Sequence, residues 1–203
     1  MRTLIAKLES ARIESMDINN AFDLSLFQLP HGHYELVVFM KLQFFFKDSH
    51  PHRWERHEQD QFIHEWQNVI HDVWGNKIIH SLPAGNTVRL TFDFHIQKGG
   101  WMFDHWEITV TKIAPEEFKV SYIDPDWNNV HLDSEDLTYV GRQRGAIHEF
   151  GHMIGLPDEY HNSRHIVDLK SIMHSGEEIR ERHYGLFTDW VERTLASTGI
   201  EIS

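Results

Sequence analysis

Residues 148–158 of the chain read His-Glu-Phe-Gly-His-Met-Ile-Gly-Leu-Pro-Asp. Two histidines four positions apart lie on the same face of a helix, so His148 and His152 can bind one metal ion together. Glu149 lies beside the first histidine, where its carboxylate can act as a general base toward water. The pattern predicts a helix over residues 141–154 that carries a metal site.

The chain must turn sharply after this helix if a third ligand close in sequence is to reach the metal. Gly155 can adopt a positive φ at a helix C-terminus without steric cost, and such a turn brings Asp158 back toward the histidines. Glu159 and His161 are alternative third ligands, but the spacing favours Asp158. We therefore expect Asp158 to complete the site and Gly155 to support it.

The composition limits which side chains can hold a metal and which partners the chain can bind. The chain has 203 residues and no cysteine, so any metal is held by histidine and carboxylate groups. Its 31 acidic and 19 basic residues give a net charge of -12, which argues against a nucleic-acid partner. No apolar run approaches the ~20 residues that a membrane-spanning helix needs. The expected cofactor is one catalytic Zn²⁺, held by His148, His152 and Asp158.

The full pattern resembles the H-E-x-x-H-x-x-G-x-x-H/D motif of the metzincin zinc metallopeptidases. An aspartate within Gly-Leu-Pro-Asp makes it most similar to the snapalysin type. The resemblance also implies a turn with a methionine beneath the zinc, and Met173, within Ser-Ile-Met-His at residues 171–174, stands at the expected distance. Ser175 occupies the position where some metzincins carry a tyrosine. The residues that match the motif are His148, Glu149, His152, Gly155 and Asp158.

This resemblance implies a zinc-dependent endopeptidase that cleaves protein or peptide substrates. Zinc would activate water for attack on the peptide bond, and Glu149 would serve as the catalytic general base. Tyr160, His183 and Tyr184 are further candidates to line the site, although the sequence does not place them.

Two other interpretations stay open from the residues alone. A non-catalytic binding module would keep zinc as a structural ion, and Glu149 would then be dispensable. A gluzincin-type peptidase would take its third ligand from the following helix. The candidates for that ligand are Glu177, Glu178 and Glu181.

Hydrophobic periodicity predicts an α+β domain. The expected strands are residues 33–46, 87–96, 105–113, 117–123 and 129–132, and the expected helices are residues 53–76, 141–154 and 178–196. This order is similar to that of a metzincin-like catalytic domain, with a mixed twisted sheet, a long helix, a zinc-binding helix, a Met-turn and a C-terminal helix. The resemblance implies that a substrate peptide binds along the edge strand at 117–123.

Residues 1–30 show no clear pattern and are expected to form an N-terminal arm. Residues 31–203 are expected to form a single, monomeric catalytic domain, with an N-terminal lobe to about residue 155 and a small C-terminal lobe over 156–203. The first residues lack the apolar run of a signal peptide. We therefore expect synthesis in the cytoplasm, and export by a route other than the Sec pathway if the protease is a secreted or injected effector or toxin.

Overall fold

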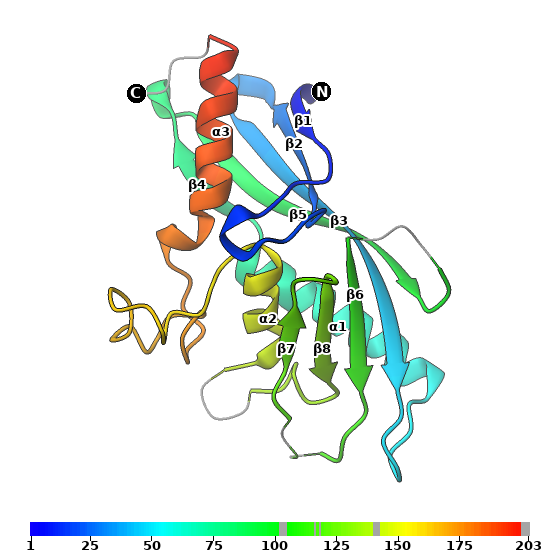
Figure 1. Ribbon diagram of the computed structural model, residues 1–203. Coiled ribbons are helices and arrows are strands. Elements are labelled where there is room, and N and C mark those ends of the chain that lie inside the picture. Colours follow the sequence, from blue (N-terminus) through cyan, green and yellow to red (C-terminus); the bar gives the residue numbers. More distant parts are fainter. Residues whose placement is uncertain (102–104, 116, 118, 140–142, 200–203) are drawn as a thin grey trace.

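One mixed sheet organises the chain in the computed structural model (Figure 1), which describes residues 1–101, 105–115, 117, 119–139 and 143–199. Within these ranges, eight strands belong to the sheet and three α-helices accompany it, which confirms the α+β class. The strands are β1 (Thr3–Leu8), β2 (Asp23–Gln28), β3 (Tyr34–Lys47), β4 (Lys77–Ser81), β5 (Thr87–Lys98), β6 (Trp106–Thr111), β7 (Tyr122–Asp124) and β8 (Asn129–Asp133). The α-helices are α1 (Arg56–Trp74), α2 (Gly145–Met153) and α3 (Gly185–Ser197).

β3 is the central strand, and its inward side chains between Tyr34 and Phe44 are buried. Its first part pairs with β2 in antiparallel and with β5 in parallel orientation, and residues 42–47 pair with β6 in parallel. β8 then pairs with β6 in parallel, and β7 with β8 in antiparallel orientation. β1 and β7 are therefore the two ends of the main path through the sheet.

α1 packs one apolar face into the core, since its apolar residues recur at helical spacing. The buried residues of this face are Phe62, Trp66, Ile70 and Trp74. The ring of Trp66 lies 5.6 Å from that of Phe44 in β3, 5.3 Å from Phe94 in β5 and 5.9 Å from Phe150 in α2. These aromatic contacts hold α2 against α1 and the sheet.

The end of the sheet beside α2 differs from the prediction (Figure 1). A strand was expected over residues 117–123, of which Phe118 lies outside the described residues, but β7 begins only at Tyr122. The backbone N–H of Lys119 donates to the carboxylate of Asp133 at 3.2 Å. The predicted extent of this strand is therefore wrong. The backbone at Lys119 bonds to the side chain of Asp133, and not to the backbone of a neighbouring strand.

Residues 1–30 do not form an arm, because β1 and β2 extend the sheet beyond β3. β4, which pairs with β5, is also absent from the prediction. Regular alternation of buried and exposed side chains is the pattern that marks a half-buried strand. The side chains of β1 do not alternate in this way. Residues 11–22, between β1 and β2, reach toward α2.

α3 is shorter than the helix expected over residues 178–196, because it begins at Gly185. Glu181–Tyr184 form a separate 3-10 helix directly before it. Upstream of that 3-10 helix, Glu178 N donates to Lys170 O at 2.8 Å and Ile172 N donates to Glu178 O at 3.0 Å. These bonds to a separate segment replace the bonds that a helix would make.

The other predicted elements correspond to observed ones with shifted ends. The helix expected over residues 141–154 is α2, and residues 141 and 142 lie outside the described ranges. None of the helices in the described part of the chain has the length and apolar composition needed to cross a bilayer.

Candidate metal centre

His148, His152 and Asp158 lie together in the structure. The two histidines are one turn apart on α2, and Asp158 follows the turn at its C-terminal end. Asp158 Oδ1 lies 3.1 Å from His148 Nε2 and 3.3 Å from His152 Nε2. One ligand atom from each residue lies within 4.8 Å of the others, so the cluster could hold a metal ion.

Backbone carbonyls orient both imidazole rings. His148 Nδ1 lies 2.8 Å from Ile172 O, and His152 Nδ1 lies 2.6 Å from Leu156 O. A carbonyl can only accept a hydrogen bond, so Nδ1 is the donor in both of these contacts. Both Nε2 atoms therefore face Asp158 as potential ligands, held by the type of outer contact found around bound metals.

Gln143, a residue that the sequence did not single out, supports this arrangement. Its side-chain amide donates to Ile172 O and, at 2.9 Å, to Gly176 O, and lies 3.0 Å from His148 Nδ1. Nothing in the local sequence marks Gln143, because the two carbonyls to which it donates are about 30 positions away in the chain.

The turn that leads to Asp158 depends on Gly155. Its φ is +95°, a region that favours glycine, as the sequence predicted. Gly155 N donates to His152 O at 2.9 Å and Leu156 N donates to Gly151 O at 3.0 Å. These two bonds close the end of α2 and redirect the chain.

Met173 lies in a tight turn under α2, in which His174 N donates to Ser171 O at 3.0 Å. Its side chain is fully buried, and a Cβ added to Gly151 would lie only 2.2 Å from Met173 Sδ. Gly151 stands between the two histidines, so its lack of a side chain allows the turn to approach the helix. A glycine inside a helix was the available sequence signal for this contact.

Glu149 is a buried carboxylate beside the two histidines, and its Oε2 has no hydrogen-bond partner among the described residues. Burial, together with the charges of Asp136 and Asp158 and against the opposing effect of His148, raises the pKa of Glu149 to about 7. A buried, unpartnered carboxylate oxygen next to a cluster of ligands is available to accept a proton from a molecule bound there.

The cluster opens into a cleft of about 670 Å³. The cleft is lined by apolar groups, including Met16, Val120 and Tyr160, and by the polar groups of Ser175 and the cluster itself. The Tyr160 hydroxyl donates to Asp158 Oδ2 at 2.6 Å. Burial and this bond raise the pKa of Tyr160 to about 12, so the hydroxyl remains a donor at neutral pH.

Asp158 stays ionised in this environment. Burial alone would raise its pKa, but hydrogen bonds with His148, His152 and Tyr160 outweigh burial and hold the pKa well below its usual range. A carboxylate that is charged near neutral pH is ready to bind a cation without first losing a proton.

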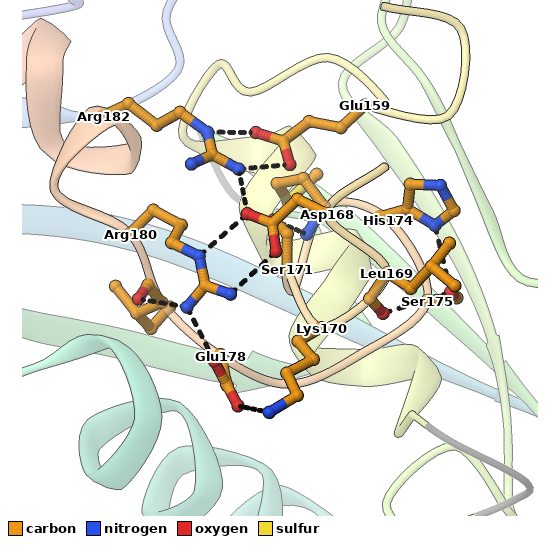
Figure 2. A network of polar contacts seen from close by, with 12 residues as sticks. Glu159, Asp168, Leu169, Lys170, Ser171, His174, Ser175, Glu178, Arg180 and Arg182 are labelled. Carbon is orange, nitrogen blue, oxygen red and sulfur yellow. Dashed lines mark hydrogen bonds and ion pairs between the residues drawn. The ribbon is translucent and has the colours of Figure 1, made fainter. Parts of the chain in front are cut away.

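Glu159, one of the alternative ligands, takes part in a network of ion pairs (Figure 2). Arg182 donates to both of its carboxylate oxygens, at 2.7 and 2.8 Å, and also to Asp168 at 2.8 Å. Arg180 donates twice more to Asp168, at 2.8 Å each, and binds Glu178. The network ties the segment around Asp158 to the segment before α3.

The pKa values of the acids in this network follow from these contacts. Burial opposes ionisation of Glu159, but hydrogen bonds from Arg182 and Ser171 lower its pKa to about 2. The two arginines hold the pKa of Asp168 well below its usual range. Both carboxylates are therefore charged near neutral pH and bound by arginine, and neither belongs to the cluster of His148, His152 and Asp158.

The remaining candidates lie elsewhere. His161 is exposed and its ring contacts Tyr160, with centroids 4.5 Å apart. His183 and Tyr184 are buried in the core beside Trp74, and the Tyr184 hydroxyl donates to Trp74 O.

The glutamates considered for a gluzincin-type site are also separate from the cluster. Glu177 pairs with Arg144 at 2.8 Å and Glu178 with Arg180 at 2.8 Å, and Glu181 is exposed. The cluster is formed by His148, His152 and Asp158.

The raised pKa of Glu149 makes a prediction for the metal-free protein. The folded state binds this proton more tightly than the unfolded state, so folding stability should fall as pH rises from about 4.5 to about 7. At 1.36 kcal/mol per pKa unit, the loss is on the order of 3 kcal/mol. Urea unfolding at pH 5 and pH 8 should show that Glu149→Gln loses less stability than wild type between these values. An identical pH dependence in the two proteins would contradict the raised pKa.

Comparison with known protein families found no matching family, and comparison with curated protein sequences found no similar protein. The functional argument therefore rests on the motif and on the geometry of the cluster.

Proposed function

We propose that this chain is a zinc-dependent endopeptidase of the metzincin type, with a motif similar to that of snapalysins. The observation that carries the proposal is the meeting of His148, His152 and Asp158 beside the buried carboxylate of Glu149, in a cleft large enough for a peptide side chain. The Oε2 atom of that carboxylate has no hydrogen-bond partner among the described residues. The turn of Met173 beneath the helix agrees with the same interpretation.

The donor set suits zinc. Bonds of 2.0–2.2 Å in a tetrahedral site place neighbouring ligand atoms about 3.3–3.6 Å apart. Asp158 Oδ1 lies at 3.1 and 3.3 Å from the two Nε2 atoms, which is close to that spacing. A structural zinc usually has four protein ligands, whereas the cluster among the described residues has three. This difference favours a catalytic site over a structural one.

When bound, zinc would polarise the scissile carbonyl and activate water for attack. Glu149 would accept a proton from that water and then deliver it to the nitrogen of the leaving amine. Its burial, and the lack of a partner for its Oε2 in the part of the chain that the structure describes, keep this oxygen free for both transfers. The carbonyls of Ile172 and Leu156 hold the imidazoles in place.

The substrate would bind along β7. This strand is the end of the sheet, and residues 120–123 line the cleft. Backbone groups on the free edge of a strand can pair with an extended peptide. We therefore propose that a peptide segment lies along this edge with its scissile bond beside Glu149.

Tyr160→Phe is expected to weaken zinc binding about tenfold, at the lower end of the effect of losing an outer contact to a ligand. The variant removes the hydrogen bond to Asp158 Oδ2 and leaves the ring in the cleft. Competition with a chromophoric chelator measures the affinity. Tyr139→Phe, at an exposed tyrosine, is the control. Equal affinities for wild type and Tyr160→Phe would show that the hydroxyl does not support Asp158.

Metal analysis of the purified protein, together with cleavage of an unfolded protein substrate, tests the proposed function. We expect one zinc per chain and cleavage that stops when a chelator removes zinc and returns when zinc is restored. Bound zinc without cleavage across a broad set of substrates would favour the binding module.

A further inference from the structure

Residues 11–22 form a small hairpin between β1 and β2, beside the C-terminal end of α2 (Figure 1). Ile13 N donates to Ile18 O at 2.8 Å, and Ile18 N donates to Ile13 O at 3.1 Å. Residues 14–16 make a 3-10 turn at the tip, and Asp17 closes the turn with a φ of 54°. We refer to residues 11–22 as the N-terminal hairpin.

Polar contacts fix the N-terminal hairpin to the sheet. Asn128 Nδ2 donates to Asn19 O at 2.7 Å and to His105 O at 2.8 Å. Trp106 Nε1, in the first residue of β6, donates to Ala21 O at 2.9 Å and is buried. The hairpin is therefore attached to the start of β6 and to the turn before β8.

The tip of the hairpin reaches the turn that leads to Asp158. Ile13 is fully buried, and a Cβ added to Gly155 would lie 2.6 Å from Ile13 Cγ2. Ser15 Oγ donates to Gly155 O at 3.3 Å. Met16, the next residue, lines the cleft. One short segment thus contacts both the turn and the space in front of the cluster.

The contacts of the hairpin with Gly155 affect the positions of two proposed ligands, His152 and Asp158. Gly155 lies between His152 and Asp158, and Leu156 O accepts the hydrogen bond from His152 Nδ1. A shift of Gly155 would move Leu156 O away from one ligand and displace the backbone that carries the other. A ligand misplaced by a fraction of an ångström costs metal affinity, because the donor atoms must meet at fixed distances.

We propose that the N-terminal hairpin forms part of the metal site. Ile13 and Ser15 position the Gly155 turn. Met16 forms an apolar wall of the cleft and selects an apolar substrate side chain. The inference rests on the proposed zinc-peptidase function. Ile13 and Ser15 are positioning residues, whereas Met16 contacts the substrate.

The positioning role is tested by the zinc affinity of the full-length protein, measured by chelator competition. Ile13→Ala removes every side-chain atom that approaches Gly155 and is expected to weaken zinc binding at least about tenfold. Ile13→Val keeps Cγ1 and Cγ2 and should bind zinc nearly as tightly as wild type. Ile108→Ala truncates an equally buried isoleucine of β6 and should lower stability without a comparable loss of zinc affinity.

Ser15→Ala provides a second test that does not disturb the core, because Ser15 is exposed. It is expected to weaken zinc binding by a smaller, measurable factor. If Ile13→Ala fails to fold, the zinc affinity of Ser15→Ala decides whether the hairpin has a positioning role. Wild-type zinc affinity in every hairpin variant that folds would overturn the positioning role, and so would an equal loss in Ile108→Ala.

Met16→Ala tests the substrate contact of Met16 separately from the positioning of the Gly155 turn. We expect unchanged zinc affinity and a higher KM for peptides with a large apolar side chain at the affected position, with kcat altered less. An unchanged KM across a panel of peptides would overturn the selective role of Met16. If wild type binds no zinc, the proposed function fails and this inference falls with it. If wild type binds zinc and cleaves peptides while the hairpin variants behave like wild type, only the inference about the hairpin fails.

Discussion

Glu149→Gln is expected to slow peptide hydrolysis by about 10²- to 10⁴-fold, the loss typical of removing a general base. Glutamine has nearly the same shape but cannot accept a proton from water and pass it on. Because Glu149 is not a member of the cluster of His148, His152 and Asp158, the variant should keep one zinc per chain. Zinc content and initial cleavage rates on an unfolded protein, measured on the same preparation, test both parts.

The control for this experiment is Glu65→Gln, which changes an exposed carboxylate on α1 that is hydrogen-bonded to Gln61. It should cleave as fast as wild type. Equal rates for wild type and Glu149→Gln would rule out Glu149 as the base. Loss of zinc from Glu149→Gln would instead make Glu149 part of the coordination or of its support.

Asp158→Ala should have the largest effect on metal binding. Losing an outer contact to a ligand costs about 10- to 100-fold in affinity, so losing a ligand itself should cost more than about 100-fold. Glu159→Ala should have a smaller effect, because its carboxylate binds Arg182 and the substitution acts through the loop. His161→Ala should leave affinity close to that of wild type, since this side chain is exposed. Chelator competition on the three variants measures the order.

His152→Ala provides an independent check on the same cluster and should lower zinc content sharply. If Glu159→Ala or His161→Ala weakens zinc more than Asp158→Ala does, the third ligand is wrong and the similarity to snapalysins loses its main support. Full retention of zinc in His152→Ala would mean that the metal binds elsewhere.

The parts of the structure that follow from local pattern were predictable from the sequence. Alternation that is strict in β5 and partial in β3 marks these strands, and helical spacing marks α1, because each of these elements buries one face. β1 escaped prediction since its side chains remain largely exposed. The last helix was predicted to begin at residue 178, but backbone bonds of Glu178 with residues 170 and 172 and the ion pair of Arg180 with Asp168 hold the start of this segment in another conformation. Glu181–Tyr184 then form a 3-10 helix before α3 begins.

The candidate site also has a part that was predictable from the sequence and a part that was not. The meeting of His148, His152 and Asp158 follows from spacing within eleven residues, where helix geometry and one glycine turn suffice. Gln143 and the N-terminal hairpin were beyond the reach of the sequence, because their contacts join segments about 30 and 140 positions apart.

The network of Arg180, Arg182, Asp168 and Glu159 has a consequence for local opening. Between α2 and the 3-10 helix at Glu181–Tyr184, the described chain forms no α-helix and no strand of the sheet, so its order depends heavily on these side-chain pairs. Segments of this kind tend to open at a lower free energy than the core. Opening would release Asp158 and the Met173 turn in one step, and a metal bound only to the closed form would oppose it by mass action. Resistance of this segment to proteolytic nicking and retention of the metal are thus two measures of a single equilibrium.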